Sequence, residues 1–116
     1  MKAFSLATLA ALAGCAAMPS APPQLVQIHR DVNARITYQN YTKKDWRIIP
    51  AGTTATGNCA VYAMTYKWEL LRAGYKPEVI LCHTWDGIGH AYTRAGQWAL
   101  DNRFKQPIPI TQQDCR

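Results

Sequence analysis

The spacing of hydrophobic positions predicts two helices. Between residue 22 and about residue 36, apolar side chains recur at helical intervals after a pair of prolines, which indicates an amphipathic helix. A second helix is predicted over residues 58–73, because Gly74 follows the apolar pattern where a helix-ending glycine is common. The apolar stripe that we expect the second helix to bury consists of Ala60, Ala63, Met64, Lys67, Trp68 and Leu71.

The remaining pattern predicts an irregular connection followed by strands. Residues 38–57 lack sustained periodicity and are rich in Thr, Gly and Asn, which indicates a long loop. Residues 79–85 have the β-branched and aromatic content of a strand. Residues 89–93 and 97–101 are expected to form a hairpin, and the proline-rich end of the chain an edge or coil. The order of helix, loop, helix and antiparallel strands predicts one domain of α+β class.

The N-terminus has the pattern of an export signal. Met1-Lys2 provides a positive charge, and the apolar run that follows is too short to span a bilayer. The string of small residues ending in Cys15 resembles the cleavage site of bacterial lipoproteins, and Ala16 after it favours the outer membrane, on its periplasmic face. The alternative is an ordinary signal peptide cut near Ala17. We expect a signal peptide at 1–14, a lipidated cysteine and flexible tether at 15–24, and a folded domain at 25–116.

Charge and composition argue against a nucleic-acid partner. The chain has 13 Lys and Arg against 7 Asp and Glu, a formal net charge of +6. Its basic residues form no run longer than the pair Lys43-Lys44, and they do not alternate with aromatic residues. The excess positive charge favours contact with anionic envelope surfaces, and the N-terminal lipid would hold the protein at a membrane.

Two of the four cysteines are candidates for a disulfide. Cys82 lies in an apolar run and Cys115 next to the C-terminus, and an oxidising periplasm would allow them to pair. Whether they pair depends on a geometry that the sequence does not show.

Cys59 is left without a partner and is the candidate nucleophile. If Asn58 caps the second helix, Cys59 is its first residue, where the helix dipole favours thiolate over thiol. The backbone N–H groups of the same turn can hold a developing oxyanion. The alternative is a small, inert cysteine packed in the core.

His90 and Asp101 are the candidate partners of this cysteine. A hairpin loop of two or four residues centred on Ala95-Gly96 places His90 directly opposite Asp101, on the same face and roughly 5 Å apart at Cβ. The carboxylate would then orient the imidazole toward a nucleophile. An odd loop would place Leu100 or Asn102 opposite instead. Taken singly, His90 also fits an ordinary strand histidine, and Asp101 a turn residue.

The other histidines and a metal site are weaker candidates. His29 and His83 are both expected to be structural. A zinc site formed by Cys59, Cys82, His83 and His90 lacks the short ligand spacing such sites use, so we predict no metal and no cofactor.

Several blocks of sequence resemble the bacterial transglutaminase-like cysteine peptidases. They are residues 57–63, 67–74, 89–91 and 100–103, and the resemblance extends over residues 25–110. It implies a papain-like core, in which a helix bearing the cysteine packs on a small antiparallel sheet bearing the histidine and aspartate. Matching by motif gives the triad Cys59, His90 and Asp101.

The same resemblance implies a function with alternatives. An exported cysteine peptidase or amidase would cleave a peptide or protein through a thioester on Cys59. The backbone N–H of Cys59 would be one oxyanion donor and Trp46 a candidate for the second, with core packing as the alternative for Trp46. An amine in place of water would give transamidation, and a non-catalytic envelope lipoprotein using the fold as a binding module is the alternative from another class.

One departure from the family bears on calcium. Family members usually carry acidic residues on both sides of the cysteine, and in some these help to bind calcium. Asn58 and Ala60 occupy those positions here. Because Ca²⁺ prefers carboxylate oxygens, we predict that activity does not depend on calcium.

Overall fold

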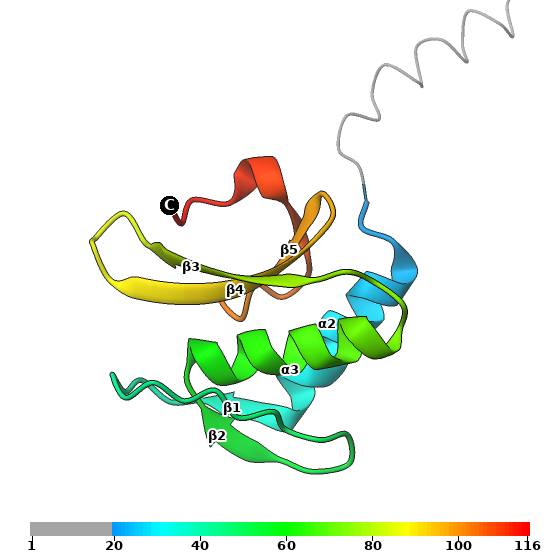
Figure 1. Ribbon diagram of the computed structural model, residues 1–116, viewed down its shortest axis with the longest axis horizontal. Helices are drawn as coiled ribbons and strands as arrows, with labels where there is room; N and C mark the ends of the chain where they lie inside the picture. The colour runs from blue at the N-terminus through cyan, green and yellow to red at the C-terminus, as the bar shows by residue number, and fades with distance from the viewer. Residues whose placement is uncertain (1–19) are drawn as a thin grey trace, which may run out of the picture.

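The computed structural model describes residues 20–116, which form two helices and two small sheets (Figure 1). The signal peptide and the lipidation of Cys15 fall on residues outside this part. None of the described helices is both long and apolar enough to cross a membrane. The elements are α2 (Pro23–Arg35), β1 (Ile36–Tyr38), β2 (Ala55–Gly57), α3 (Cys59–Arg72), β3 (Glu78–His83), β4 (Gly89–Ala95), β5 (Trp98–Leu100), β6 (Ile108–Pro109) and the 3-10 turn η1 (Ile110–Gln112).

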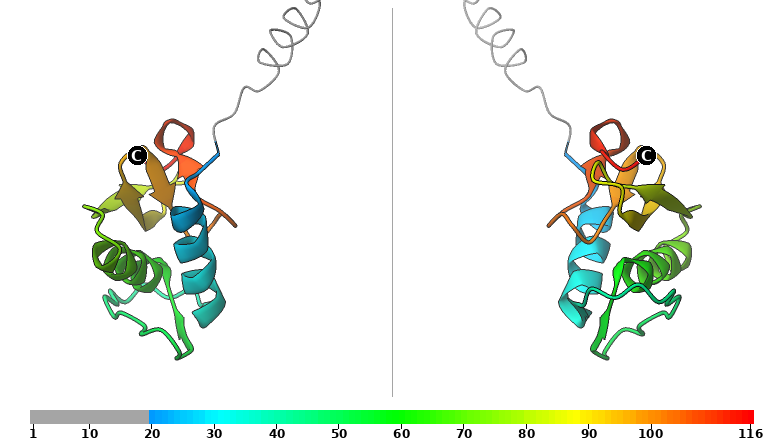
Figure 2. Two further views of the ribbon diagram at one scale, coloured as in Figure 1. Left: turned by 90° about the vertical axis from the view of Figure 1, so that its right-hand side faces the viewer. Right: turned by 90° about the vertical axis from the view of Figure 1, so that its left-hand side faces the viewer.

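The α+β prediction is confirmed, and α3 is the central element. In Figure 1 it lies between the four-stranded sheet and the β1–β2 pair, and its contacts extend to β4, β3, β2 and α2. Figure 2 shows α2 beside both α3 and the C-terminal strands. A helix covered on several sides must bury more than one narrow stripe, so the single apolar stripe predicted for α3 is too narrow.

The first helix forms where it was predicted. It begins at Pro23, two positions before the expected start of the domain, since proline suits the first turn of a helix. Leu25, His29 and Val32 are spaced at helical intervals and are fully buried. Arg35 at its end forms a 2.8 Å ion pair with Glu69 of α3, which ties the two helices together.

The second helix is also confirmed, but its predicted stripe is partly wrong. Trp68 and Leu71 are 44% and 48% exposed, whereas Tyr62 and Tyr66 are buried. The hydroxyl of Tyr62 donates to the carbonyl of Ile36 at 2.9 Å, and that of Tyr66 bonds to a side chain of α2. Burying a tyrosine is favourable when its hydroxyl has a partner, and only the tertiary structure supplies those partners.

The loop prediction for residues 38–57 holds for most of the segment but misses its ends. Ile36 to Tyr38 pair in parallel with Ala55 to Gly57. Strands of three residues are too short to show a periodic pattern.

The hairpin of β4 and β5 has a different register from the predicted one. Its turn is formed by Gly96 and Gln97, so Thr93 pairs with Leu100. Each residue of β4 therefore pairs with a residue two positions further along the chain than predicted. Gly96 has φ of 60°, which suits the first turn position of a tight hairpin that requires positive φ only there. His90 is therefore not opposite Asp101. Because the loop still has an even number of residues, both side chains remain on one face.

The four-stranded sheet has the order β3-β4-β5-β6, and the C-terminal segment closes one side of it. The expected edge character of this segment is confirmed by the two-residue strand β6. A disulfide joins Cys82 of β3 to Cys115, with Cα atoms 5.5 Å apart. His83 and Arg116 then exchange two backbone hydrogen bonds of 2.7 and 2.9 Å, so the chain end runs beside β3.

Candidate active site

Cys59 is the first residue of α3, and the local sequence explains why the helix begins there. The side chain of Asn58 accepts a hydrogen bond from the backbone N–H of Ala60 at 3.2 Å, as an N-cap should. A Cβ at Gly57 would lie 2.6 Å from Cβ of Val61, so only glycine allows the chain to enter the helix so closely. The cap and the glycine together place the thiol at the positive end of the helix.

The thiol is half-buried and lines an open cleft. This placement contradicts the alternative that Cys59 is packed in the core, and the reactivity of its thiol stays a prediction. In the described part of the chain, it is also the cysteine that remains outside the disulfide.

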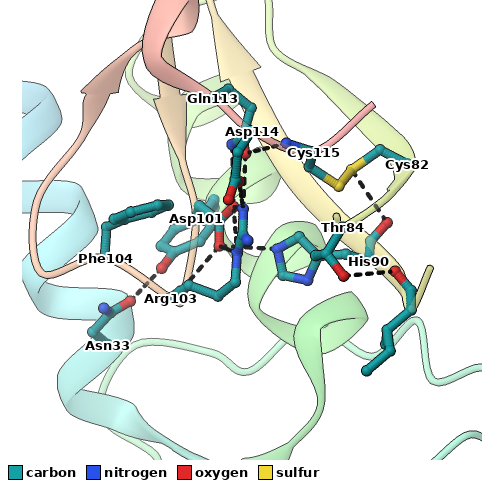
Figure 3. Close-up of polar contacts among 12 residues, drawn as sticks. Asn33, Cys82, Thr84, His90, Asp101, Arg103, Phe104, Gln113, Asp114 and Cys115 are labelled. Atoms are coloured by element: carbon teal, nitrogen blue, oxygen red, sulfur yellow. Dashed lines mark hydrogen bonds and ion pairs between the residues drawn. A yellow bond between two sulfur atoms is a disulfide. The ribbon is translucent and has the colours of Figure 1, made fainter. Parts of the chain in front are cut away.

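His90 interacts with both Cys59 and Asp101. Its Nε2 atom lies 2.9 Å from Oδ1 of Asp101 (Figure 3), and its imidazole is near enough to the Cys59 thiol to lower the pKa of that thiol. The Asp101 side chain is fully buried and that of His90 is 7% exposed. Since Nε2 is engaged by the carboxylate, Nδ1 is the ring nitrogen left for the sulfur. The three residues predicted to form the site are therefore together.

The electrostatics favour a charged pair of cysteine and histidine. Burial raises the pKa of Cys59. The neighbouring His90 and the backbone of Ala91 together lower that pKa by more than burial raises it, so the net shift is downward. Burial lowers the pKa of His90, whereas hydrogen bonds with Asp101 and Cys59 raise it, to about 9. Near neutral pH this combination favours thiolate beside imidazolium, the reactive form of a catalytic cysteine.

Besides His90, Asp101 accepts hydrogen bonds from two residues that the sequence did not identify, Arg103 and Gln113. Burial opposes its charge, but hydrogen bonds from His90 and Arg103 hold the pKa of the carboxyl well below its usual range. Nη2 of Arg103 lies 3.0 Å from Oδ2, and the backbone N–H of Arg103 donates to Oδ1 at 2.9 Å. Nε2 of Gln113 donates to Oδ2 at 3.1 Å (Figure 3).

The sequence pointed toward one of these two donors, Arg103, more than toward the other, Gln113. Arg103 lies in a block that carries the family resemblance, although no role was predicted for it. Gln113 is twelve positions from Asp101 along a proline-rich segment. Its nearness to Cys115 was the only signal for it, and that signal has meaning only once the disulfide is known.

The remaining histidines have different surroundings. His29 is fully buried, its Nε2 lies 2.8 Å from the carbonyl oxygen of Phe104, and its ring packs 5.2 Å from that of Tyr66. Burial lowers its pKa, so it is a neutral structural residue as predicted. His83 bonds to the chain end through its backbone, while its exposed side chain lines the cleft.

The cleft beside Cys59 has a volume of about 1090 Å³. Trp46 lies on its wall and is 41% exposed, so core packing is the wrong interpretation of this residue. Its role as a second oxyanion donor stays a prediction. Five exposed hydrophobic residues line the cleft: Tyr38, Trp46, Leu81, Trp85 and Ile88.

The hypothetical zinc set does not form. Cys82 is bound in the disulfide and cannot provide a thiolate. Within residues 20–116, no group of three or more His, Cys, Asp or Glu side chains is arranged to hold a metal ion. Beside Cys59, the amide of Asn58 is occupied by the helix cap and by the carbonyls of Tyr41 and Lys43.

The sequence matches no family model and shows no significant similarity to a curated protein. The site combines a thiol with a lowered pKa, an imidazole that contributes to that shift, a buried carboxylate bonded to the imidazole, and an open cleft. These are the kinds of group that nucleophilic attack on a carbonyl carbon requires.

Proposed function

We propose that this protein is a cysteine peptidase or amidase of the transglutaminase-like, papain-like kind. The observation that carries the proposal is that His90 hydrogen-bonds to the buried Asp101 and lowers the pKa of Cys59 at the edge of an open cleft. The arrangement of a cysteine at a helix N-terminus against an antiparallel sheet with histidine and aspartate supports the papain-like core.

In the first half-reaction the Cys59 thiolate attacks the carbonyl carbon of a peptide or amide. In the first turn of α3, the N–H groups of Ala60 and Val61 bond to Asn58, so we assign the N–H of Cys59 to the oxyanion. His90 then gives its proton to the leaving amine. The C–N bond breaks and a thioester on Cys59 remains.

In the second half-reaction His90 takes a proton from water, and the hydroxide attacks the thioester. The carboxylic acid product leaves and the thiolate is restored. Asp101 stays ionised throughout, since its role is to orient the imidazole and to stabilise its charged form. An amine in place of water would give transamidation by the same steps.

We propose that the protein works in the cell envelope, anchored through Cys15 to the outer membrane. The disulfide between Cys82 and Cys115 supports an oxidising compartment. The sequence of residues 1–15 supports export and lipidation.

The chemistry is tested by labelling the full chain with iodoacetamide near neutral pH without reductant. Mass analysis of the peptides should place the label on Cys59, because Cys82 and Cys115 are bonded to each other and any label on Cys15 falls on a separate peptide. We expect rapid labelling that slows in His90→Ala. An unreactive Cys59 would refute the nucleophile and favour the non-catalytic binding module.

The activity is tested by comparing envelope proteins exposed to the native chain with those exposed to Cys59→Ser. We expect new cleavage products that appear only with the native chain. A matching set of products from both chains would overturn the peptidase.

A further inference from the structure

The cleft carries more free positive charge than negative charge. Lys43 and Lys44 line it, and neither has an ion-pair partner in the part of the chain that the structure describes. The positive charge of Arg103 is shared between two carboxylates. Asp86 is the acidic residue on the lining, and its carboxylate accepts a hydrogen bond from Thr84.

The loop that carries the two lysines is hydrogen-bonded to the residue before Cys59. Nδ2 of Asn58 donates to the carbonyl of Lys43 at 3.0 Å and to that of Tyr41 at 3.2 Å. Asn58 directly precedes Cys59, so the loop that carries the lysines is fastened next to the nucleophile. In Figure 1 this loop and the tip of the β3–β4 hairpin project on the same side of the molecule, below and above the start of α3.

The wall formed by β3 and the hairpin tip exposes three large apolar side chains beside Asp86. Trp85, Ile88 and Leu81 are 87%, 62% and 67% exposed and belong to β3 or to the hairpin tip. Large apolar side chains that remain in contact with water around a polar site mark a surface that binds a partner. A chain lying across Cys59 would meet lysines on one side and these side chains on the other.

We propose that the cleft binds an extended peptide segment in which Asp or Glu lies close to an apolar residue at the cleaved bond. This inference rests on the proposed hydrolase function and names its substrate class. A negatively charged membrane surface would also attract lysines and apolar side chains. The peptide is favoured because these residues surround Cys59, and a bilayer seated on them would cover the nucleophile.

The test uses fluorogenic peptides with one apolar core and a single flanking position that is Glu, Gln or Lys. We expect kcat/KM for the Glu peptide to exceed that for the Gln peptide about threefold, the Lys peptide to be slowest, and the differences to shrink as salt is raised. The variant Lys43→Glu with Lys44→Glu should reverse the order. The matched control is Lys76→Glu with Lys105→Glu. It makes the same change in net charge at positions that do not line the cleft, and it should keep the native order.

The outcomes distinguish a failure of this substrate inference from a failure of the proposed hydrolase function. Equal cleavage of all three peptides would overturn the acidic substrate and leave the hydrolase in place. Binding to vesicles of phosphatidylglycerol that is lost in Lys43→Glu with Lys44→Glu, without any peptide preference, would assign the patch to the membrane. Failure to cleave any peptide together with an unreactive Cys59 would remove the function itself.

A second inference comes from the C-terminal segment, and it also rests on the proposed hydrolase. Gln113 is 9% exposed, and its Oε1 accepts hydrogen bonds from Nη2 of Arg103 at 2.8 Å and from the backbone N–H of Cys115 at 3.1 Å. Two donors on Oε1 fix which end of the amide is oxygen. The Nε2 end must then face Asp101, as it does at 3.1 Å.

The geometry points to Gln113 as a positioning residue for Asp101. Its hydrogen bond holds Oδ2, which leaves Oδ1 directed at Nε2 of His90. The disulfide to Cys115 holds the segment in place, two residues beyond Gln113.

The test is the pH profile of Cys59 labelling by iodoacetamide, which needs no substrate. In Gln113→Met, which keeps the volume and loses the hydrogen bonds, we expect the rise in labelling rate to move to higher pH. A less well held Asp101 supports the His90 charge less, so His90 stabilises the Cys59 thiolate less. The exposed neighbour in Gln112→Met is the control and should leave the profile as in the native chain. A native profile in Gln113→Met overturns the proposal even if its melting temperature falls, since that combination would show a purely structural role.

Discussion

His90 and Asp101 form a 2.9 Å hydrogen bond although they are not opposite each other in the sheet. If the register of β4 and β5 is continued past its last pair, Asp101 faces Tyr92, which is two residues from His90 and on the same face. The contact is therefore a diagonal one, of the kind that long side chains can bridge. Asp101 follows the end of β5, and its carboxylate is aimed by Arg103 and Gln113 rather than by strand pairing.

The reactivity of Cys59 should depend on pH through a thiolate–imidazolium pair. The pKa of Cys59 is lowered and that of His90 is raised to about 9, so both charges are present in the range between them. We expect kcat/KM to rise with pH as Cys59 ionises and to fall as His90 loses its proton near pH 9. The measurement is a pH–rate profile, and a rate that keeps rising through pH 10 would contradict the pair.

Replacement of Asp101 by Asn should nearly abolish turnover. The buried carboxylate supplies one of the hydrogen bonds that raise the pKa of His90, so the variant should move the alkaline limb toward the ordinary value of 6.5. We expect kcat to fall about a hundredfold or more. Circular dichroism on the same sample checks that the fold persists, and a folded variant with native kcat would exclude Asp101 from the site.

Loss of the disulfide should destabilise the domain. Cys82 and Cys115 are 33 residues apart, and closing a loop of that length stabilises a fold by about 3–4 kcal/mol in the chain-entropy model. Cys82→Ala with Cys115→Ala should therefore have a lower melting temperature than the native chain without reductant. Cys59→Ser is the control, because it removes a cysteine and keeps the disulfide; an equal loss of stability in both variants would contradict the expectation.

The ion pair between Arg35 and Glu69 should contribute to stability without affecting the chemistry. It joins α2 to α3 at 2.8 Å, and both side chains are mostly buried at 11% and 15% exposure. Arg35 also donates to the carbonyl of Ile49 at 3.0 Å. Arg35→Met should lower the free energy of unfolding by roughly 3 kcal/mol in urea titration, since Glu69 is left partly unpaired. The pH profile of Cys59 labelling should not move, and a moved profile would link this pair to the site.

Calcium removal should leave the activity unchanged. The positions on either side of Cys59 are Asn58, whose amide is occupied by the helix cap and two carbonyls, and Ala60. Neither offers the carboxylate oxygen that Ca²⁺ prefers. The check is peptide cleavage after treatment with a chelator, with and without added Ca²⁺. Activity that is lost with the chelator and restored by calcium would refute the prediction.

Local sequence was enough to place the candidate nucleophile, Cys59. Capping by Asn58, the close approach allowed by Gly57 and the glycine that follows α3 all act between near neighbours, so the helix and the position of Cys59 could be predicted. The face shared by His90 and Asp101 also followed from local spacing, because any even loop preserves it.

Contacts between distant segments decided the rest. The turn at Gly96-Gln97 selected the register, because that glycine adopts positive φ, and the prediction had centred the loop one residue earlier. The parallel pairing of β1 with β2 and the buried tyrosines of α3 depend on partners far along the chain. Gln113 reaches Asp101 only because the chain end folds back and is held at Cys82. The sequence by itself determined that Cys59 begins a helix and that His90 and Asp101 share one face of the hairpin. The tertiary structure alone decided how the carboxylate is held, since the donors around a buried charge are supplied by packing between segments and not by local spacing.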